Sequence, residues 1–366
     1  MKAKTGMKKP GWILLAMALI FTGCQRGKTE SQISSGQKQA GNKTESEATK
    51  EQVRQITDMA GRTVTIPQEI KRLCAIHPIP SHMIWRLAPL KMAGIDYQFK
   101  DRMLFMPQEE KDRLLKLPVT GTFHNNMNTE TMLLVHADVI ISLTKDPNIE
   151  TEQEDFNAPI VAGSKDSLKD YEEMWRLIGK VVGEEKTANE LADYWETTMS
   201  KVTAITKNIP EDKKLKVYYA QPTPTTTVGS ESIMYSLIRM AGGITFFDHY
   251  PITKGQEQSE SIPVSMEQII AWNPDVIIAK SVKSYNEIMS NSQWSSLAAV
   301  KNKRVYVSLT YAMLDRIQSL MGLLWTAQTL YPDQCRFDFT GEMKNFYKKV
   351  YLSDAITDEQ IYEKIE

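Results

Sequence analysis

Apolar and polar positions along this chain alternate between helical and strand spacing, which predicts an α/β fold. Two segments, 130–141 (ETMLLVHADVII) and 267–278 (EQIIAWNPDVII), each run from a short amphipathic helix into a buried strand. A further short strand follows each copy, at 159–162 and at 304–309. Strands that alternate with helices favour a parallel sheet covered by helices. We therefore expect two similar Rossmann-like α/β lobes.

One long apolar stripe lies between the two copies. Apolar residues recur at steps of three and four through 186–207, which predicts a single helix of about 30 Å. We expect this helix to be a rigid strut between the lobes. The expected organisation is an N-terminal lobe at 53–167, a helical linker at 168–212 and a C-terminal lobe with terminal helices at 213–366.

The first 24 residues have the pattern of an export signal. A basic start precedes an apolar run, 12–21, that is too short to span a bilayer, which needs about 20 residues. The run ends in Phe-Thr-Gly-Cys24, which resembles the bacterial lipobox, in which the cysteine is lipidated. The alternative is a cleaved secretory signal with a chance cysteine. Residues 25–52 are polar and predict a flexible tether.

Composition excludes some classes of function. Lys and Arg number 44 against 45 Asp and Glu, a net charge of −1, whereas an electrostatic grip on nucleic acid needs a basic surface. Three cysteines are too few for a disulfide framework, and we expect Cys74 and Cys335 to be buried free thiols. Enzyme motifs such as His-Glu-x-x-His, Gly-x-Ser-x-Gly and Gly-x-x-x-x-Gly-Lys do not occur. A metal hydrolase built from scattered residues, such as His77 and His82, stays an unsupported alternative.

Three segments carry a resemblance to a known family. They are an opening hairpin at 58–67 (DMAGRTVTIP), the second repeat with its flank at 264–278, and a C-terminal pattern at 324–333 (LWTAQTLYPD). In this order they resemble the ABC-importer substrate-binding proteins for iron–siderophores, haem and cobalamin. The resemblance runs from about residue 56 to the end.

This resemblance implies a receptor, not an enzyme. A lipid-anchored subunit on the outer face of the cytoplasmic membrane would capture an iron or cobalt chelate between its lobes. It would deliver the chelate to a membrane permease powered by an ATPase, and no resident cofactor is expected. In the family an acidic residue on each lobe docks onto the permease, and Glu130 and Glu267 match these positions. The alternative role for both is a helix N-terminal carboxylate favoured by the helix dipole.

The ligand site is expected beyond the carboxyl ends of the parallel strands. The loops there are 77–82, 96–106 and 121–127 in the first lobe and 221–232, 249–254, 280–284 and 311–316 in the second. The candidate ligand-binding residues in these loops are His77, His82, Arg102, His124, His249, Lys280, Tyr311 and Arg316.

Residue chemistry suggests a role for each kind of candidate. His77, His82 and His124 are candidates for ligating a metal or for sitting axially on a haem or corrin. Surface histidines without a ligand role are the alternative, and His136 lies instead at the position of Asn273 in the second repeat. The arginines and Lys280 offer charge to anionic groups, and Tyr311 offers a flat contact.

A second kind of binding protein remains open. A bare transition-metal ion needs three or four converging histidines and carboxylates. An oxyanion such as molybdate needs hydroxyl and backbone N–H groups, which the polar run 223–232 (TPTTTVGSES) supplies. The same run is equally typical of a solvated loop, so the sequence leaves chelate, ion and oxyanion undecided.

Overall fold

The structure is a computed structural model that describes residues 52–121, 127–144, 146 and 148–366. Residues Lys50–Glu366 form one compact unit. The expected signal peptide, Cys24, nearly all of the tether and His124 lie outside the described residues. Within the described part, no helix combines the length and the apolarity needed to cross a membrane.

The chain enters through an antiparallel hairpin of β1 (Val53–Thr57) and β2 (Thr63–Pro67). Its turn is held by Asp58, whose carboxylate accepts the N–H groups of Ala60 and Arg62 at 3.0 and 2.9 Å. The Arg62 guanidinium pairs with Asp58 at 2.8 Å and donates to the Ile160 carbonyl. The turn therefore also fastens the hairpin to the strand that contains Ile160.

The first lobe is built on a parallel sheet of order β3-β4-β5. Its strands, Leu73–Ala75, Val139–Leu143 and Ile160–Gly163, are buried along their whole length, as expected for strands covered on both faces. The helices of this lobe are α1 (Pro78–Leu87), α2 (Gln108–Leu114), α3 (Thr129–Val135) and α4 (Ile149–Asp155), with the 3₁₀ turns η1 (Pro89–Lys91) and η2 (Tyr97–Arg102).

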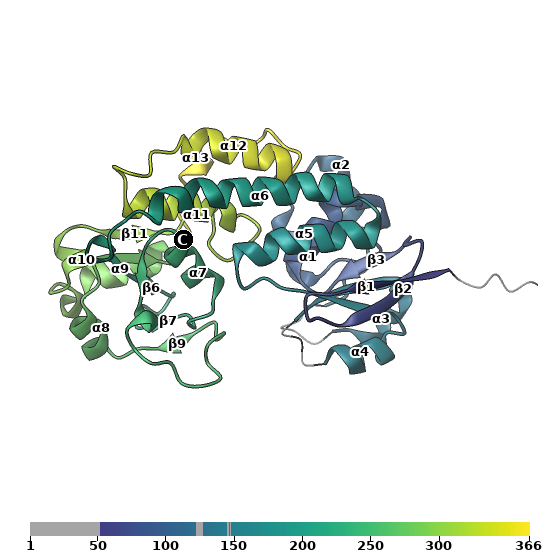
Figure 1. The fold of residues 1–366 in the computed structure, drawn as a ribbon, viewed down its shortest axis with the longest axis horizontal. Coiled ribbons are helices and arrows are strands. Elements are labelled where there is room, and N and C mark those ends of the chain that lie inside the picture. Colours follow the sequence, from purple (N-terminus) through teal and green to yellow (C-terminus); the bar gives the residue numbers. More distant parts are fainter. Residues whose placement is uncertain (1–51, 122–126, 145, 147) are drawn as a thin grey trace, which may run out of the picture. The chain divides into compact units, whose positions relative to one another are not determined.

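The second lobe repeats this plan with a four-stranded parallel sheet of order β11-β10-β6-β8. Its strands are β6 (Lys216–Ala220), β8 (Ile244–Thr245), β10 (Val276–Ala279) and β11 (Val305–Val307). A small antiparallel pair, β7 (Thr226–Thr227) with β9 (Ile262–Pro263), lies apart from it. The helices are α7 (Ile233–Met240), α8 (Met266–Trp272), α9 (Val282–Ser290) and α10 (Ala298–Lys301), with the 3₁₀ turns η3 (Glu211–Lys213), η4 (Phe246–Asp248) and η5 (Ser292–Trp294). The predicted α/β architecture is confirmed (Figure 1).

The sequence repeat has a local physical cause. Helices α3 and α8 both end on a left-handed residue, His136 (φ 46°) and Asn273 (φ 50°). Two residues later, the Asp138 carboxylate accepts the backbone N–H of Arg72 at 2.8 Å, and the Asp275 carboxylate accepts that of Lys216 at 2.9 Å. Each aspartate thus fixes the approach of its strand to the neighbouring strand.

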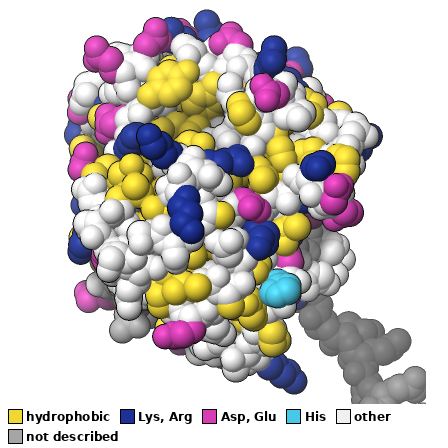
Figure 2. All heavy atoms as spheres, turned by 90° about the vertical axis from the view of Figure 1, so that its left-hand side faces the viewer, with side chains coloured by type: hydrophobic (Ala, Val, Ile, Leu, Met, Phe, Trp, Pro, Cys, Tyr) yellow, Lys and Arg dark blue, Asp and Glu magenta, His cyan; other side chains and the backbone are white. Residues whose placement is uncertain are grey.

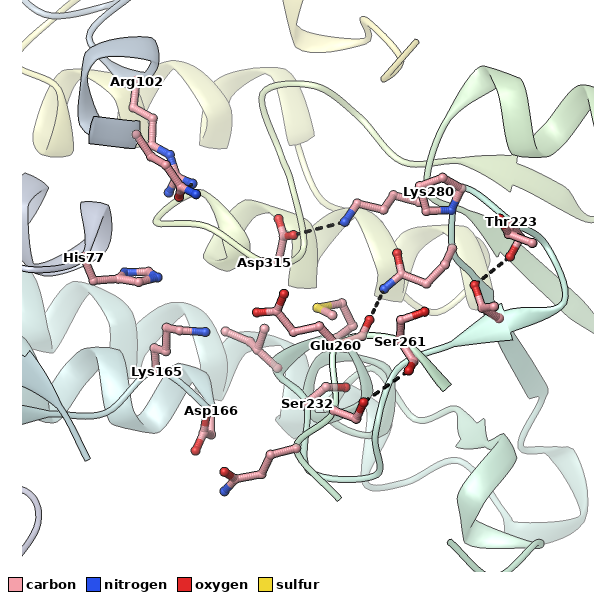
Figure 3. Close-up of a pocket in the computed structure, with 18 residues that line it drawn as sticks. His77, Arg102, Lys165, Asp166, Thr223, Ser232, Glu260, Ser261, Lys280 and Asp315 are labelled. Carbon is pink, nitrogen blue, oxygen red and sulfur yellow. Dashed lines mark hydrogen bonds and ion pairs between the residues drawn. The ribbon is translucent and has the colours of Figure 1, made fainter. Parts of the chain in front are cut away.

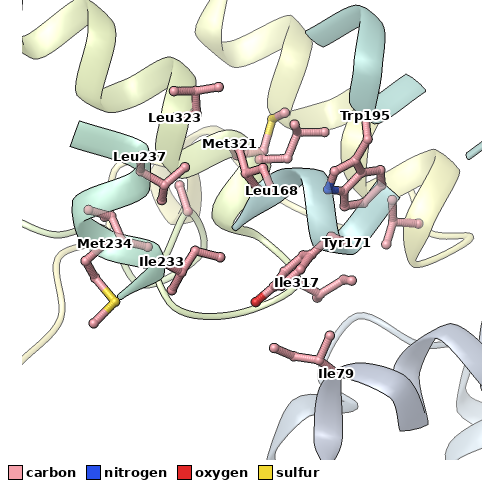
Figure 4. Close-up of a cluster of buried hydrophobic side chains, with 14 of the residues drawn as sticks. Ile79, Leu168, Tyr171, Trp195, Ile233, Met234, Leu237, Ile317, Met321 and Leu323 are labelled. Atoms are coloured by element: carbon pink, nitrogen blue, oxygen red, sulfur yellow. The ribbon is translucent and has the colours of Figure 1, made fainter. Parts of the chain in front are cut away.

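Two helices join the lobes, α5 (Leu168–Val182) and α6 (Glu185–Thr206). Helix α6 begins and ends one residue before the predicted 186–207. It packs against α5 and also against α7 and α11 (Ser319–Leu330) of the second lobe. Figure 4 shows part of the buried cluster at this junction. Its members include Tyr171 of α5, Trp195 of α6, Leu237 of α7 and Met321 of α11.

The chain ends in two further helices, α12 (Phe339–Val350) and α13 (Asp358–Ile361). The Thr357 side chain accepts the Gln360 N–H and caps α13 in a capping box. Cys74 and Cys335 are free and buried, as expected. On the face drawn in Figure 2, basic and acidic side chains are interspersed rather than gathered by sign.

We predict that Gly179→Ala destabilises the protein, although alanine normally favours a helix interior by about 1 kcal/mol. A Cβ at Gly179 would lie 2.3 Å from the Ala188 Cβ, so α5 and α6 could no longer approach as closely. Overpacking of this kind costs about 1–3 kcal/mol, which urea unfolding followed by tryptophan fluorescence measures. The exposed neighbour Lys180→Ala serves as control, and a Gly179→Ala protein as stable as wild type would contradict the prediction.

Candidate functional site

A cavity of about 500 Å³ lies where loops of both lobes meet (Figure 3). The first lobe contributes His77, which caps α1, together with Gln98 and Arg102 of η2 and the Lys165–Asp166 segment after β5. The second lobe contributes the loop after β6, the start of α7, residues 258–261, Lys280 and Asp315. The segments after β3, β5, β6 and β10 lie at the carboxyl ends of parallel strands, where ligands of open α/β sheets bind.

Side chains of both charges line the cavity. Arg102 and Lys165 come from the first lobe, and Lys280 comes from the second. The carboxylates are Asp166, Glu260 and Asp315, of which Asp315 pairs with Lys280 at 3.6 Å (Figure 3). Both partners of this pair are about 30 % exposed (28 % and 30 %), so they are partly withdrawn from water.

Arg102 is a partly buried cation that has no ion-pair partner among the described residues. Its guanidinium donates to the Gln98 side chain at 3.3 Å, and no carboxylate comes within ion-pair distance of it among the described residues. The pKa of Arg102 is lowered to about 10, first by burial and then by the Arg316 charge nearby, while Asp315 opposes the shift. An arginine whose pKa falls in this way is one whose charge the surroundings do not fully balance.

The second-lobe wall of the cavity is tied together by backbone contacts. The Gln221 amide donates to the Glu260 carbonyl at 2.6 Å, and the Gly229 N–H donates to the Ser259 carbonyl at 2.8 Å. A Cβ at Gly229 would lie 2.2 Å from the Glu257 carbonyl oxygen, so only glycine allows this approach. The wall of residues 258–261 is therefore held in place against the loop 221–232.

Helix α7 turns its N-terminus toward the cavity. The Ser232 side chain accepts the Tyr235 N–H as the N-cap, and Ser232, Ile233 and Met234 all line the space. The N–H groups of Ile233 and Met234 belong to the first turn and have no partner inside the helix. Such groups, aided by the helix dipole, are available to an anion.

The lining is polar in character. Among the described residues that line it, no Trp, Tyr or Phe occurs, and the apolar members are Pro222, Ile233 and Met234. A flat macrocycle such as haem is usually held by broad apolar and aromatic surface, and the described lining residues include no aromatic ring.

A family profile described as periplasmic binding protein matches residues 102–308, which is more than half of the chain. The chain belongs to the periplasmic binding protein family. It is a substrate-binding protein of the kind that serves an ABC transporter together with a permease and an ATPase.

Individual relatives cover most of the chain at low identity. The molybdate-binding protein MolA of Haemophilus influenzae is 24 % identical in an alignment of 334 residues that covers 83 % of this chain and 92 % of MolA. An uncharacterized ABC transporter substrate-binding lipoprotein of Bacillus subtilis, YvrC, is 22 % identical over 287 residues, covering 76 % and 85 %. The solved ABC transporter solute binding protein of Sulfurospirillum deleyianum superposes with a TM-score of 0.72 at 24 % identity, covering 84 % of this chain and 98 % of that one.

In this chain, three of the predicted ligand-binding residues line the cavity, namely His77, Arg102 and Lys280. His124 lies outside the described residues. His249 is exposed and packs edge-on against Tyr250 away from the cavity. Arg316 does not line the cavity and acts on it through its charge on Arg102.

Tyr311 also lies away from the cavity. Its ring packs edge-on against Phe105 at 5.0 Å, and its carbonyl accepts the Tyr347 hydroxyl at 2.9 Å. It therefore joins an aromatic cluster between the lobes instead of offering a flat contact to a ligand.

The prediction that His82 lies in a cleft loop is wrong. The segment 77–82 is the first turn of α1, with Pro78 at its start, so His82 points into the core. Its Nε2 lies 3.2 Å from the Val350 carbonyl, and its ring lies 4.4 Å from that of Tyr351. The signal that was missed is proline at the first helical position, which is typical of a helix start. Trp85, on the same helix, also lies in the core and is 1 % exposed.

The histidines do not assemble a metal centre in the part of the chain that the structure covers. There, no group of three or more His, Cys, Asp or Glu is placed to hold a metal ion. The Nδ1 of His77 accepts the Ile79 N–H at 3.2 Å as part of the helix cap, while His82 faces Val350. The two residues therefore serve different structural roles.

Several lining residues escaped the sequence prediction. Lys165 and Asp166 follow β5 directly, so the rule that selects carboxyl ends of strands would have found them. Glu260 and its neighbours lie before the short β9 and reach the cavity only through contacts with 221–232. No local sequence pattern predicts that these residues line the cavity.

We predict that His82 makes stability depend on pH. Burial lowers its pKa from 6.5 to about 3, so below pH 6.5 the unfolded chain binds a proton that the folded protein does not. Stability is therefore lost as pH falls from about 6.5 toward 3, amounting to about 3 kcal/mol between about pH 7 and pH 4.5. His82→Gln lacks this contribution, and urea unfolding at both pH values measures the difference. The exposed His249→Gln should keep the wild-type pH dependence, and equal pH dependence in His82→Gln and wild type would contradict the prediction.

Proposed function

We propose that this substrate-binding protein captures a small hydrophilic anion, an oxyanion such as molybdate, and delivers it to a membrane permease. The observation that carries the proposal is that Arg102 of the first lobe and Lys280 of the second lobe line the same polar cavity. An anion between them would contact both lobes at once.

The electrostatics of Arg102 support an anionic ligand. Arg102 is partly buried, has Arg316 as a like-charged neighbour, and donates to the uncharged Gln98 amide in the described part of the chain. An anion beside its guanidinium would form charge-assisted hydrogen bonds, which are stronger than neutral ones. It would also offset the repulsion between the two arginines.

Hydrogen-bond chemistry favours an oxyanion in particular. Molybdate carries acceptor oxygens on all sides and no donors, so its receptor must supply donors. The N–H groups of Ile233 and Met234, the hydroxyls of Thr223 and Ser232, and the Lys280 ammonium surround the same space. Preformed donors at a helix N-terminus are a general solution for binding oxyanions.

This proposal puts the oxyanion alternative ahead of the iron or cobalt chelate. The relative from Haemophilus influenzae is named as a molybdate-binding protein and covers 83 % of this chain. Haem and corrins suit the cavity poorly, since its described lining holds no aromatic ring. A bare metal ion is disfavoured because the described residues assemble no three-residue ligand set.

A hydrophilic metal chelate is the second candidate. Its support is the size of the cavity, about 500 Å³, which lies within the range of organic-ligand pockets, about 300–1,000 Å³. A ferric complex of carboxylate ligands would meet the same cations and hydroxyls. The two candidates therefore differ in size and not in the sign of their charge.

We predict that Arg102→Gln and Lys280→Gln each weaken molybdate binding by about 30-fold, because each removes a charged partner worth about 2 kcal/mol or more. Isothermal titration calorimetry of the full chain in detergent provides the measurement. Lys283→Gln is the matched control, since Lys283 is exposed and does not line the cavity.

The same titration with ferric citrate separates the two candidates. Binding of molybdate that is lost in both variants supports the oxyanion. Binding of ferric citrate without molybdate favours the chelate. Equal affinity of the variants and wild type for whichever ligand binds would contradict the assignment of this cavity.

We also propose that Cys24 anchors the protein to the outer face of the cytoplasmic membrane. The lipobox-like Phe-Thr-Gly-Cys sequence and the lipoprotein relative of Bacillus subtilis support this. The polar residues 25–52 would then act as the tether between membrane and lobes.

For the permease, we propose Glu130 and Glu267 as docking residues. Both are exposed in the first turns of the equivalent helices α3 and α8. We predict that Glu130→Lys combined with Glu267→Lys lowers cellular uptake of labelled molybdate by about fivefold or more, because a like charge facing a basic partner opposes docking. Molybdate affinity in solution should stay unchanged. Glu173→Lys, an exposed glutamate on α5, is the control, and unchanged uptake in the double variant would contradict the docking role.

A further inference from the structure

The second-lobe wall of the cavity contains an irregularity in its backbone pairing. The antiparallel pair of β7 and β9 is regular where it places Thr227 opposite Ile262. Further along the same two segments, the Gly229 N–H donates to the Ser259 carbonyl at 2.8 Å. In a regular antiparallel ladder, equal numbers of residues would lie between these two pairings on both segments.

The numbers are not equal. Only Val228 lies between the pairings on the first segment, whereas Glu260 and Ser261 lie between them on the second. Two residues opposite one is the arrangement of a β-bulge, which re-aims side chains next to functional sites. Consecutive residues of a regular strand face opposite sides, yet Glu260 and Ser261 both line the cavity. The bulge therefore accounts for an acidic side chain on this wall.

Glu260 completes an even balance of charge in the cavity. The described lining holds three Lys or Arg residues and three Asp or Glu residues. Of the two acidic residues from the second lobe, Asp315 lies 3.6 Å from the Lys280 ammonium. The Glu260 side chain extends from the bulge into the cavity, toward the side that carries Lys165 (Figure 3). A carboxylate at this place repels an entering anion in proportion to the charge of that anion.

We propose that Glu260 is a specificity-determining residue, whose carboxylate reduces the advantage that a dianion has over a monoanion of the same shape. The inference rests on the proposed function, since it concerns which anion the same cavity accepts. When the lining charges balance, the charge of the ligand contributes less to affinity, and the hydrogen-bond donors of the cavity discriminate between anions. Repulsive groups are a general means of setting specificity.

Molybdate and perrhenate are matched probes for this role. Both are tetrahedral oxyanions of nearly equal size, but molybdate carries two negative charges and perrhenate carries one. The Coulomb energy between Glu260 and a bound anion is proportional to the charge of the anion. Loss of the Glu260 charge should therefore strengthen molybdate binding by about tenfold and perrhenate binding by only about threefold.

The experiment is calorimetric titration of the full chain in detergent with each anion, for wild type and Glu260→Gln. The variant keeps the length of the side chain and should raise the ratio of molybdate affinity to perrhenate affinity by about threefold. Its molybdate affinity should also fall more steeply between about 20 mM and about 500 mM NaCl, since salt screens an unbalanced charge. Glu257→Gln is the matched control, because Glu257 belongs to the same segment but does not line the cavity.

Deletion of Glu260 tests the bulge itself. Removing one residue from a regular strand turns the following side chains to the other face, whereas removing the extra residue of a bulge leaves the pairing on both sides in place. The deletion should therefore keep the thermal midpoint within about 3 °C of wild type and raise the affinity ratio as Glu260→Gln does. Deletion of Pro263, which lies opposite Thr226 in the regular pair, should destabilise the protein. Equal destabilisation by both deletions would show that the bulge assignment is wrong.

The remaining outcomes separate this role from the proposed function. Equal gains for the two anions, no gain, or weaker binding of both in Glu260→Gln would overturn the role of Glu260 and leave the oxyanion site in place. If the chain binds ferric citrate and neither oxyanion, the proposed oxyanion fails, and the same variant should then raise the affinity for ferric citrate. If no anion binds to wild type or to the variant, the proposed function and the role of Glu260 fail together.

Discussion

The close approach of α5 and α6 is the packing constraint on which the binding cavity depends. Gly179 and Ala188 leave no room for another methyl group between the two helices. From this seam, α6 continues along α7 and α11 of the second lobe. The start of α5 follows the Lys165–Asp166 segment, and the start of α7 lines the opposite wall. Packing of apolar helix faces therefore fixes where the charged groups meet.

The charged side chains of the cavity are partly buried, which strengthens their electrostatic interactions. In water, separated surface charges are screened and contribute little. Here Arg102 is withdrawn from solvent and stands close to another arginine, while Lys280 has only a partly exposed aspartate at 3.6 Å. The positive charge of these two side chains is therefore only partly neutralised, so it can still attract an anion. The three carboxylates that line the same cavity equal its three lining Lys and Arg residues in number.

Much of the fold was predictable because periodic patterns report local structure. The buried strands β4, β5 and β10 and the long helix α6 follow from apolar spacing alone. The repeat was visible in sequence because Asp138 and Asp275 perform the same backbone-capping task in each copy. His77, Arg102 and Lys280 were found by a topological rule, since the carboxyl ends of parallel strands share one edge.

The rest of the site depends on tertiary contacts that no local pattern encodes. His82 belongs to the core because α1 begins at Pro78, whereas the sequence prediction took residues 77–82 as a loop. Glu260 reaches the cavity because Gln221 and Gly229 hold its segment in place. Loop composition alone left the ligand open between chelate, ion and oxyanion. The described lining of the cavity holds no aromatic ring, and this property emerges only in three dimensions.

The central claim is that one anion binds between Arg102 and Lys280. The most direct measurement is a crystal structure of the protein grown with molybdate, with diffraction recorded at the molybdenum absorption edge. The account predicts one strong anomalous peak in the cavity, within hydrogen-bond distance of both Arg102 and Lys280. An empty cavity under saturating molybdate, or a molybdenum peak bound only elsewhere on the chain, would contradict it.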